Sequence, residues 1–397
     1  MPWTLEDRLL LHCCQRKSRN QIRNLDGILR NIDWDVFLDK ARKEGVSPLI
    51  YCRLPAIAKD NDTIPPRVTD ALTKNYYTNA AKNTIIFQEL GKVLETFNRA
   101  GLETIILKGA ALAELVYRNL ALRAMSDVDL LVKKEDLCKI DVLLKTLGYF
   151  PSDKSVHYID IPSTYLTTRD YRSDSGKSVS FHIHWHFVNS TIPNINYIKN
   201  TKMENIWQDA EKTMIAHQET CVMAPHHLLV HLSEHALRVT HSFSKLLFFC
   251  DIYEAIVFYR ERLAWDRLIK ESREFGLDRL VYFTLYFTNE IFPAGVPEDV
   301  LVRLRPARFR LCEKIFIRLV SNNCRFSGLS YLLHLSMNKG VASKIRFVAR
   351  TFFPPCRVIA QRCGVAQKKV GLRFYLRRMN EVVIIFARSI QKIFNTG

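Results

Sequence analysis

The sequence predicts an α/β (α+β) protein in which a small mixed β-sheet lies between N-terminal and C-terminal helical segments. Three observations predict this class. Apolar residues recur at helical spacing near the N-terminus, short β-rich runs alternate with helices in the middle, and nearly everything after Pro225 is helical again. Of the 397 residues, 48% are apolar and 25% are charged, which allows sizeable cores and excludes a disordered chain or a disulfide-stabilised miniprotein.

Helices are predicted first over residues 4–58, where leucine and other apolar residues recur every three or four positions. A polar loop with two adjacent prolines ends this region, because proline breaks a helix. Two more helices are predicted over 67–80 and 82–100, and Gly101 is placed to end the second as a C-cap. The first hundred residues are therefore expected to be helical apart from that loop.

The middle of the chain changes from a helical pattern to alternating strands and helices. Strands are predicted over 103–107, 127–132, 157–161, 165–168 and 179–188, with helices over 110–117 and 135–147. Residues 170–177 are expected to form a polar turn between the last two strands. Strands that alternate with helices in this way predict a small mixed sheet.

The same patterns divide the chain into four parts, and a weak internal repeat supports the division. Trp34 lies eleven residues before Gly45. Trp265 lies eleven residues before Gly276, at an offset of 231 residues from the first pair, so each copy predicts a helical hairpin. The four predicted parts are an N-terminal helical segment (1–81), an α/β core (82–190), a helical domain (191–300) and a basic helical C-terminal region (301–397).

The formal net charge of +18 belongs to the C-terminal quarter. Residues 301–397 contain 20 of the 58 Lys and Arg side chains but only two of the 40 acidic ones, which leaves 38 basic and 38 acidic residues in the rest of the chain. Two interpretations of this basic region stay open. It binds an anionic partner, or its helices pack their apolar stripes into a core and leave the arginines in solvent.

Cysteine usage and hydropathy predict a cytoplasmic protein. The ten cysteines are scattered and none forms a CxxC pair, which is not typical of a zinc ribbon or a secreted disulfide framework. The first residues do not have the basic start and apolar core of a signal peptide. No apolar run approaches the roughly 20 residues that span a bilayer, so no transmembrane segment is expected.

The α/β core contains one motif that points to chemistry. Asp127 and Asp129 are two residues apart on a predicted strand, so their carboxylates lie on the same face. Two neighbouring negative charges are unfavourable unless a cation lies between them, and Mg²⁺ prefers such oxygen ligands. Upstream, Lys108 and Gly109 join a strand to a helix, where the lysine charge and exposed backbone amides favour phosphate. The motif therefore predicts Mg²⁺-dependent chemistry on a nucleoside triphosphate. The alternative is that Asp127 and Asp129 form a solvated strand end.

The motif and its surroundings resemble a known family. The matching residues are Leu107–Leu112, Tyr117, Arg123, Ser126–Val132 and Gly148-Tyr149. They look like the signature of the uncharacterised nucleotidyltransferase-like family in the polymerase-beta-like superfamily, and phage-defence nucleotidyltransferase toxins carry a similar string. Later features follow in the family's order over nearly the whole chain: His184-Trp185, His231, His235 and Asp251.

The resemblance implies a sheet of nucleotidyltransferase type and a role for each residue of the motif. The lysine and glycine would touch the nucleotide phosphates, the two aspartates would hold Mg²⁺, and the arginine and serine would support the loop or the triphosphate. By this resemblance the expected nucleotide-binding residues are Lys108, Gly109, Arg123 and Ser126, and the expected metal ligands are Asp127 and Asp129.

His182 departs from the family's pattern. Active members of the superfamily place a third carboxylate on a later strand, and in this family it usually lies two residues before the His-Trp pair, where this chain has His182. Imidazole is a poor ligand for Mg²⁺, although it could act as a general base in place of the carboxylate. Asp160, Asp170 or Asp174 could supply the missing oxygen from the neighbouring hairpin.

Two histidine groups allow more than one interpretation. His182, His184 and His186 alternate, so on a strand they share a face that could bind Zn²⁺ or line a polar cleft. A second group recurs every four residues on one helical face, which could pack against the core or position substrate. The members of this second group are His227, His231 and His235. For both groups, hydrogen-bonded or packed imidazoles are the favoured interpretation.

The sequence therefore predicts an Mg²⁺-dependent nucleotidyltransferase that moves a nucleoside monophosphate from a nucleoside triphosphate to a hydroxyl group of a small molecule, a peptide or RNA. Its catalytic residues would be Asp127, Asp129 and His182. One alternative is an adaptor of the same fold that binds nucleotide or peptide and has lost catalysis through the change at position 182. The other is a nucleic-acid-binding protein that acts through residues 301–397.

Overall fold

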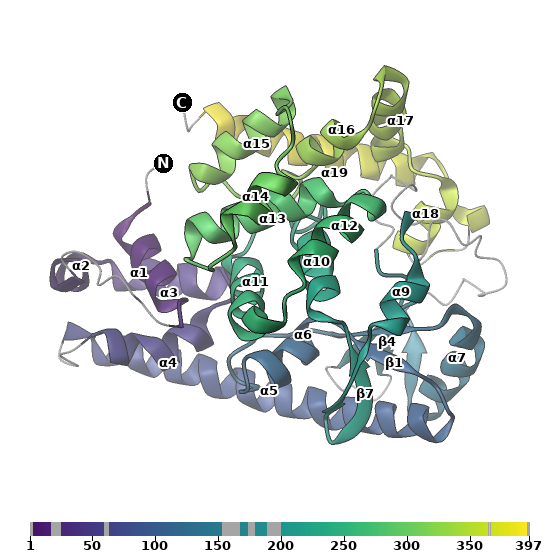
Figure 1. Cartoon of the computed structure of the whole chain (residues 1–397), viewed down its shortest axis with the longest axis horizontal. Coiled ribbons are helices and arrows are strands. Elements are labelled where there is room, and N and C mark those ends of the chain that lie inside the picture. Colours follow the sequence, from purple (N-terminus) through teal and green to yellow (C-terminus); the bar gives the residue numbers. More distant parts are fainter. Residues whose placement is uncertain are drawn as a thin grey trace.

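A seven-stranded mixed sheet organises the α/β part of the protein (Figure 1). The structure is a computed structural model that describes residues 3–16, 25–58, 63–152, 167–173, 179–188, 200–363, 365 and 367–394. The strands are β1 (Thr104–Ile106), β2 (Val128–Val132), β3 (Tyr149–Pro151), β4 (Thr168–Ser173), β5 (Ser180–His184), β6 (Glu211–Ile215) and β7 (Gln218–Val222). Their order across the sheet is β3-β4-β5-β2-β1-β7-β6. Helices precede and follow this sheet, so the predicted fold class is confirmed.

The centre of the sheet determines which residues meet. Strand β2 is antiparallel to β1 and parallel to β5, and β1 is parallel to β7 on its other side. Strand β4 is antiparallel to both β5 and β3. The end of β1 therefore lies at the same edge of the sheet as the beginnings of β2 and β5. In the register of β2 with β5, Asp129 lies opposite His182.

One long helix replaces the two helices predicted over 67–80 and 82–100. The N-terminal helices are α1 (Leu5–Cys13), α2 (Leu25–Asn31), α3 (Trp34–Lys43), α4 (Ser47–Ile57) and α5 (Pro66–Arg99). Helix α5 continues through residue 81 because Ala80, Ala81 and Lys82 are strong helix formers and nothing there breaks the helix. It ends as expected before Gly101, which has a φ of 71° that glycine adopts without strain.

Strand β4 also differs from the expectation. Residues 170–173, predicted as part of a turn, continue this strand and pair with β5 and β3. Arg169 and Tyr171 are buried whereas Asp170 and Arg172 are not, so burial alternates along β4 as in a strand. The polar residues of this segment are typical of a turn, which is why the sequence pattern predicted one. Strand β3 and the β6–β7 hairpin were not predicted. The predicted strand over 157–161 lies outside the described residues, as does 165–166.

The remaining helices follow the strand region as expected. Short helical segments in the central part are α6 (Lys108–Ala111), a π-helical turn η2 (Leu112–Val116), η3 (Lys134–Asp136) and α7 (Leu137–Thr146). The later ones are α9 (Met203–Gln208), α10 (Pro225–Ala236), α11 (Leu246–Tyr259), η5 (Arg260–Arg262), α12 (Trp265–Phe275), α13 (Asp278–Ile291), α14 (Glu298–Leu304), α15 (Leu311–Ser321), α16 (Tyr331–Met337), α17 (Val341–Phe352), α18 (Cys356–Arg362), η6 (Gln367–Lys369) and α19 (Leu372–Phe394).

Two hydrophobic cores hold these elements together. One joins α5 and α7 to the sheet, with Leu90, Ile140 and Leu130 fully buried. The other joins the N-terminal helices to α10–α16, although these two groups are far apart in sequence. Both predicted hairpins, α3–α4 and α12–α13, are present in this second core. Their glycines, Gly45 and Gly276, have φ values of 75° and 73°, as such turns require.

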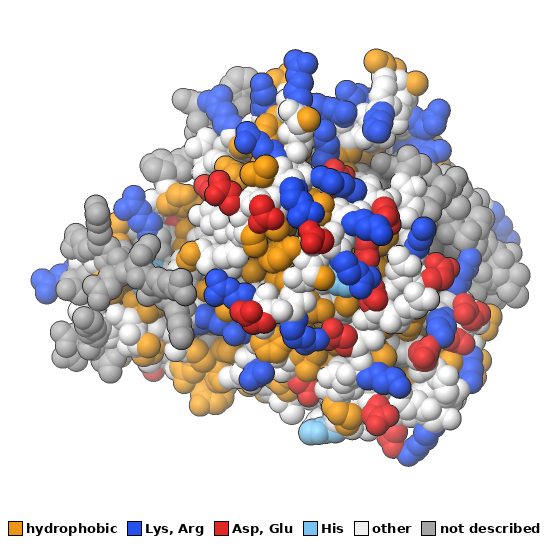
Figure 2. Space-filling model, in the orientation of Figure 1, with side chains coloured by type: hydrophobic (Ala, Val, Ile, Leu, Met, Phe, Trp, Pro, Cys, Tyr) orange, Lys and Arg blue, Asp and Glu red, His pale blue; other side chains and the backbone are white. Residues whose placement is uncertain are grey.

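The basic region forms the helices after α14. In Figure 2 Lys and Arg side chains gather at the upper end of the molecule, over α15–α17, with few acidic neighbours. Exposed apolar side chains accompany them, among them Val341 and Ile345 on α17 and Leu372 on α19. Within the described parts of the chain, none of the helices has the length and hydropathy needed to cross a membrane.

Candidate active site

The motif residues meet at one edge of the sheet, where β1 ends and β2 and β5 begin. The backbone N–H of Leu107 donates a hydrogen bond to the carbonyl of Asp129 (3.0 Å), which extends the β1–β2 pairing and places Lys108 beside this aspartate. Asp127 directly precedes β2, and His182 comes from β5. Three separate segments of the core therefore supply one group of polar side chains.

Asp129 lies at the buried end of this group and is held by two donors. The ammonium of Lys108 is 2.9 Å from its Oδ1, and Nε2 of His184 is 2.8 Å from the same oxygen. Burial alone would raise the pKa of Asp129, but Lys108 and the hydrogen bond from His184 hold it well below its usual value. Burial lowers the pKa of His184 to about 4 in spite of the neighbouring carboxylate. Near pH 7 the site therefore holds an ionised Asp129, paired with Lys108, and a neutral His184 that donates its Nε2 proton.

Lys108 occupies an unusual backbone position. Its φ of 41° lies in the left-handed region, which costs a non-glycine residue about 1–3 kcal/mol. Its side chain is only 6% exposed and ends on Asp129. Such strain persists only where the surroundings determine the conformation, and here it directs the lysine charge into the site.

Asp127 lies at the solvent side of the same group. Its Oδ1 accepts a hydrogen bond from the hydroxyl of Ser126 (2.8 Å), and its Oδ2 is 3.0 Å from Nδ1 of His182. The other ring nitrogen of His182 is 3.6 Å from Oδ1 of Asp170 on β4. The side chains of Asp127 and His182 are 32% and 31% exposed, so both can be reached by a ligand. The result is a row of carboxylate, imidazole and carboxylate across three strands.

Arg123 lies behind the carboxylates and is buried. Its Nη2 is 2.8 Å from Oδ2 of Asp251 on α11, and the hydroxyl of Tyr117 donates to Oδ1 of the same carboxylate (3.0 Å). A methyl group on Gly109 would lie 2.5 Å from Nη1 of Arg123. Arg123 is therefore anchored to α11 through Asp251, and Gly109 makes room for its guanidinium.

A comparison with models of protein families identifies the family of the chain. Residues 30–293 match the model of a family described as an uncharacterised nucleotidyltransferase. The chain belongs to this uncharacterised nucleotidyltransferase family. The match runs from the N-terminal helices to the end of α13 and includes the whole sheet and the group around Asp129. A comparison with curated proteins found no match.

In this chain His182 lies on the parallel strand next to β2, opposite Asp129. Of the aspartates considered as substitutes for the third carboxylate, Asp170 lies close by, on the far side of the imidazole. The ring separates it from Asp127, so Asp170 meets the pair through His182. Asp160 and Asp174 lie outside the described residues.

Two of the other histidines, His186 and His231, make hydrogen bonds within or to the segment that follows β5. The backbone N–H of Val188 donates to Nδ1 of His186 (3.0 Å). Nδ1 of His231 on α10 is 3.0 Å from the carbonyl oxygen of Phe187. These contacts are those of packed, hydrogen-bonded imidazoles. His182 and His184 form, with Asp129, a group whose ligand atoms are close enough for a metal ion.

Sequence reasoning missed Asn83, which holds the loop that carries Arg123. This fully buried side chain on α5 donates from Nδ2 to the backbone carbonyls of Leu120 (2.5 Å) and Arg123 (2.8 Å). The sequence does contain a signal for Asn83, because this polar residue lies three positions before Ile86 on the apolar face of α5. A buried amide in such a stripe indicates a specific backbone partner.

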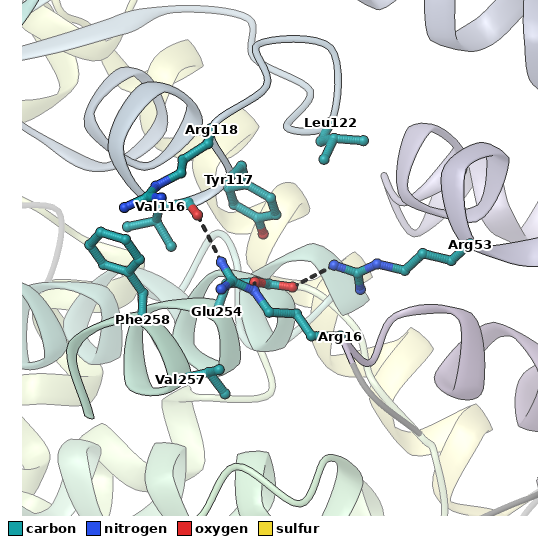
Figure 3. A pocket seen from close by; sticks show the side chains of 9 residues that line it. All are labelled: Arg16, Arg53, Val116, Tyr117, Arg118, Leu122, Glu254, Val257 and Phe258. Carbon is teal, nitrogen blue, oxygen red and sulfur yellow. Dashed lines mark hydrogen bonds and ion pairs between the residues drawn. The ribbon is translucent and has the colours of Figure 1, made fainter. Parts of the chain in front are cut away.

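Tyr117 also lines a pocket of about 420 Å³ (Figure 3). Arg16, Arg53 and Arg118 line it together with one carboxylate, Glu254. Glu254 accepts a hydrogen bond from Arg53 (2.7 Å) and pairs with Arg16. The lining therefore keeps an excess of positive charge, which suits an anionic group.

Replacing Gly109 by alanine is expected to lower the free energy of unfolding by about 1–3 kcal/mol, because the added methyl group displaces a guanidinium that Asp251 holds. Urea unfolding measures the change. Gly371→Ala is the matched control, since a methyl group there meets nothing within 4 Å. Equal stabilities of the two variants would contradict the packing of Arg123 on Gly109.

Acidification is expected to lower the free energy of unfolding between pH 6.5 and about 4. His184 takes up a proton near pH 4 in the folded state but near 6.5 when unfolded, so the unfolded state binds more protons in this window. His184→Gln, which keeps a donor for Asp129, should make the dependence shallower by about 1 kcal/mol per pH unit. Urea unfolding in EDTA between pH 5 and 6 measures this slope, and an unchanged slope would show that His184 is charged in the folded protein.

Proposed function

We propose that the protein is an Mg²⁺-dependent nucleotidyltransferase that moves a nucleoside monophosphate from a nucleoside triphosphate to a hydroxyl group. The acceptor class is a small molecule, a peptide or RNA. The observation that carries the proposal is the meeting of Asp127 and Asp129 beside Lys108, at the start of α6, in a chain of a nucleotidyltransferase family.

The donor set of the site fits Mg²⁺. Asp127 and Asp129 both approach Nδ1 of His182, at 3.0 and 3.8 Å, so their oxygens face one small region. Carboxylate oxygens are the ligands that Mg²⁺ prefers, and one carboxylate remains open to solvent for a metal that keeps some of its waters. When bound there, Mg²⁺ would neutralise phosphate charge and lower the pKa of the attacking hydroxyl.

Lys108 is the candidate residue for holding the phosphates. In the structure its ammonium balances Asp129. A bound triphosphate would offer this charge a second anionic partner. The first backbone N–H groups of α6 would favour the same anion, as those at the start of a helix do. Arg123 and Ser126 would support the site indirectly. Arg123 anchors its loop to Asp251, and the hydroxyl of Ser126 orients Asp127 by a hydrogen bond.

His182 is the candidate general base. Its Nδ1 faces the carboxylate pair, and Asp170 lies at its Nε2, where a carboxylate stabilises an imidazolium. The acceptor oxygen would attack the α-phosphorus, pyrophosphate would leave, and the hydroxyl proton would pass to His182. In this scheme imidazole does the work of the third carboxylate.

The second candidate function is nucleotide binding without transfer. The replacement of the third carboxylate by His182 is the observation that favours it. An anionic partner for residues 301–397 is compatible with either function, because a polyanionic acceptor such as RNA would be attracted to that region.

The test supplies the protein with α-labelled nucleoside triphosphates, Mg²⁺ and separate pools of RNA, peptides and small metabolites. We expect label to pass to one pool with release of one pyrophosphate for each transfer, and EDTA to abolish both. Mg²⁺-dependent binding without release of pyrophosphate would establish the adaptor instead. RNA binding that weakens steeply with salt, without any nucleotide binding, would favour the nucleic-acid-binding alternative.

A further inference from the structure

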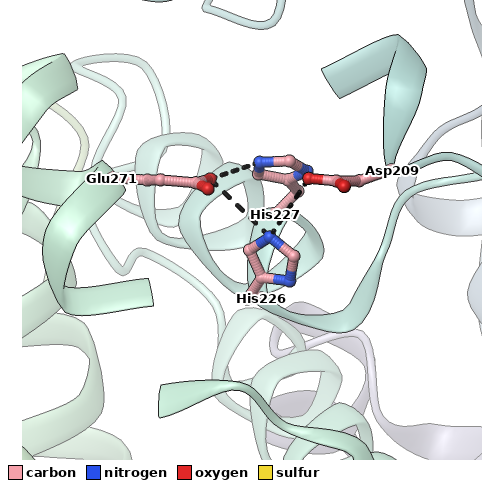
Figure 4. A group of neighbouring side chains, drawn as sticks. All are labelled: Asp209, His226, His227 and Glu271. Atoms are coloured by element: carbon pink, nitrogen blue, oxygen red, sulfur yellow. Dashed lines mark hydrogen bonds and ion pairs between the residues drawn. The ribbon is translucent and has the colours of Figure 1, made fainter. Parts of the chain in front are cut away.

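A second group of side chains that could bind a metal ion shares no residue with the candidate active site (Figure 4). Asp209 follows α9, His226 and His227 lie in the first turn of α10, and Glu271 belongs to α12. One ligand atom from each residue lies within 4.8 Å of all the others. Helices α10 and α12 and the residue after α9 thus contribute two imidazoles and two carboxylates to one small volume.

The spacing of these atoms matches a four-coordinate ion. Ligands bound tetrahedrally at about 2.1 Å lie about 3.4 Å from one another. Nε2 of His226 is 3.6 Å from Oε2 of Glu271 and 3.8 Å from Oδ2 of Asp209. Nε2 of His227 contacts the same oxygen of Glu271 more closely, and a small movement of either side chain opens that edge.

His226 supplies an independent reason to expect a ligand. The residue is only 4% exposed, and its Nε2 has no hydrogen-bond partner among the described residues. This nitrogen faces Glu271 and Asp209, as Figure 4 shows. A buried polar atom without a partner is costly, and a metal ion bound at this nitrogen removes the cost.

Arg267 completes the surroundings of the group. Its guanidinium donates to Oε1 of Glu271 (2.9 Å), which leaves Oε2 of Glu271 turned toward the imidazoles. Such an outer contact orients a carboxylate that binds a metal. Arg267 also pairs with Oδ2 of Asp209, the oxygen that lies 3.8 Å from Nε2 of His226. With two carboxylates and one arginine the group keeps one negative charge, so a divalent cation is electrostatically acceptable.

We propose that Asp209, His226, His227 and Glu271 bind a structural Zn²⁺ ion that ties α9, α10 and α12 together. Mixed imidazole and carboxylate ligands in a closed set of four suit Zn²⁺ better than Mg²⁺. The other histidine-containing group, around Asp129, offers three such residues and already holds the ammonium of Lys108. The two groups have no residue in common, so the proposed zinc site does not depend on the proposed nucleotidyl transfer.

The test measures Zn²⁺ binding to the metal-stripped, full-length protein in competition with a chromophoric chelator. A His182→Gln background removes one of the three ligands around Asp129 and so weakens competing Zn²⁺ binding at the candidate active site. We expect one tightly bound equivalent of Zn²⁺, and at least about a 100-fold loss of affinity in His226→Gln, because even the loss of an outer contact costs about 10- to 100-fold. His217→Gln, which removes an exposed imidazole, is the matched control and should bind as before.

Asp209→Ala provides a second variant, since the side chain of Asp209 is 25% exposed and its loss need not disturb the core. If His226→Gln does not fold, the affinity of this variant decides. Substitution by Co²⁺ reports the ligand set, and we expect the visible spectrum of a tetrahedral site without a thiolate band. The absence of tight Zn²⁺ binding, unchanged affinity in the folded variants, or a thiolate band from the cysteines would overturn the proposal.

Discussion

Replacing Asp127 by asparagine is expected to reduce nucleotidyl transfer at least about 100-fold while the protein stays folded. Asparagine has the same size, and the side chain of Asp127 is 32% exposed, so the change removes a charge without opening a cavity. A metal ion contributes several kcal/mol to transition-state stabilisation, and each 1.4 kcal/mol corresponds to about tenfold in rate. The measurement is the rate of pyrophosphate release at saturating nucleotide and Mg²⁺, with circular dichroism as the check on folding.

Glu135→Gln is the matched control for this variant. Glu135 is an exposed carboxylate on η3, shortly after β2, so its loss changes the charge of the same region without touching the site. We expect this variant to release pyrophosphate at the rate of the unmodified protein. Full activity of Asp127→Asn, with the same dependence on Mg²⁺, would show that the acidic pair does not hold the metal.

The largest effect on stability is expected from Asp251→Asn, which should lower the free energy of unfolding by about 3–5 kcal/mol. Asp251 is 3% exposed in its side chain and accepts hydrogen bonds from Arg123 (2.8 Å) and Tyr117 (3.0 Å). Asparagine leaves the guanidinium buried without an opposite charge, and this uncompensated charge is the source of the cost. Urea unfolding measures the difference.

Two controls separate this effect from a general sensitivity to charge. Arg99→Ala breaks an exposed pair with Glu95 on α5, with side chains 77% and 45% exposed, and should change stability by less than about 1 kcal/mol. The double variant Arg123→Met with Asp251→Leu leaves no buried charge and should be more stable than Asp251→Asn alone. A cost for Asp251→Asn as small as that for Arg99→Ala would contradict the buried ion pair.

Local patterns were sufficient to predict the fold class and the elements around the motif. The runs before Lys108 and after Asp127 are short and apolar with a change of period, and both are strands in the structure. The hydrophobic pattern did not show that α5 is continuous. Its first half is mostly polar and its second half carries an apolar stripe, so the pattern predicted two helices. The β6–β7 hairpin was missed because most of its side chains are polar and only Ile215, Thr220 and Val222 are buried, so the alternating apolar pattern of a strand is lacking.

The candidate site was predictable where its residues lie close together in sequence. Asp127 and Asp129 share one strand end, and Lys108 precedes them by one helical segment. The supporting contacts cross long stretches of chain and leave no local signal. Asp251 is 128 residues from Arg123, and the bond of Asn83 to the backbone of Arg123 spans 40 residues.

The four ligands of the proposed zinc site show the same limit. His226 and His227 are adjacent in sequence, but Asp209 precedes them before the β6–β7 hairpin, and Glu271 lies 44 residues beyond His227. No CxxC or HExxH spacing marks such a set. Only the packing of α12 against the start of α10 brings these ligands together.

Calorimetric titration of the purified protein with each of the four nucleoside triphosphates, with and without Mg²⁺, tests the central claim most directly. Nucleotidyl transfer from the pair Asp127 and Asp129 requires that at least one nucleotide binds more tightly when Mg²⁺ is present. We expect this enhancement in the unmodified protein and its loss in Asp127→Asn. Failure of every nucleotide to bind, or binding that is equal with and without Mg²⁺, would contradict the claim.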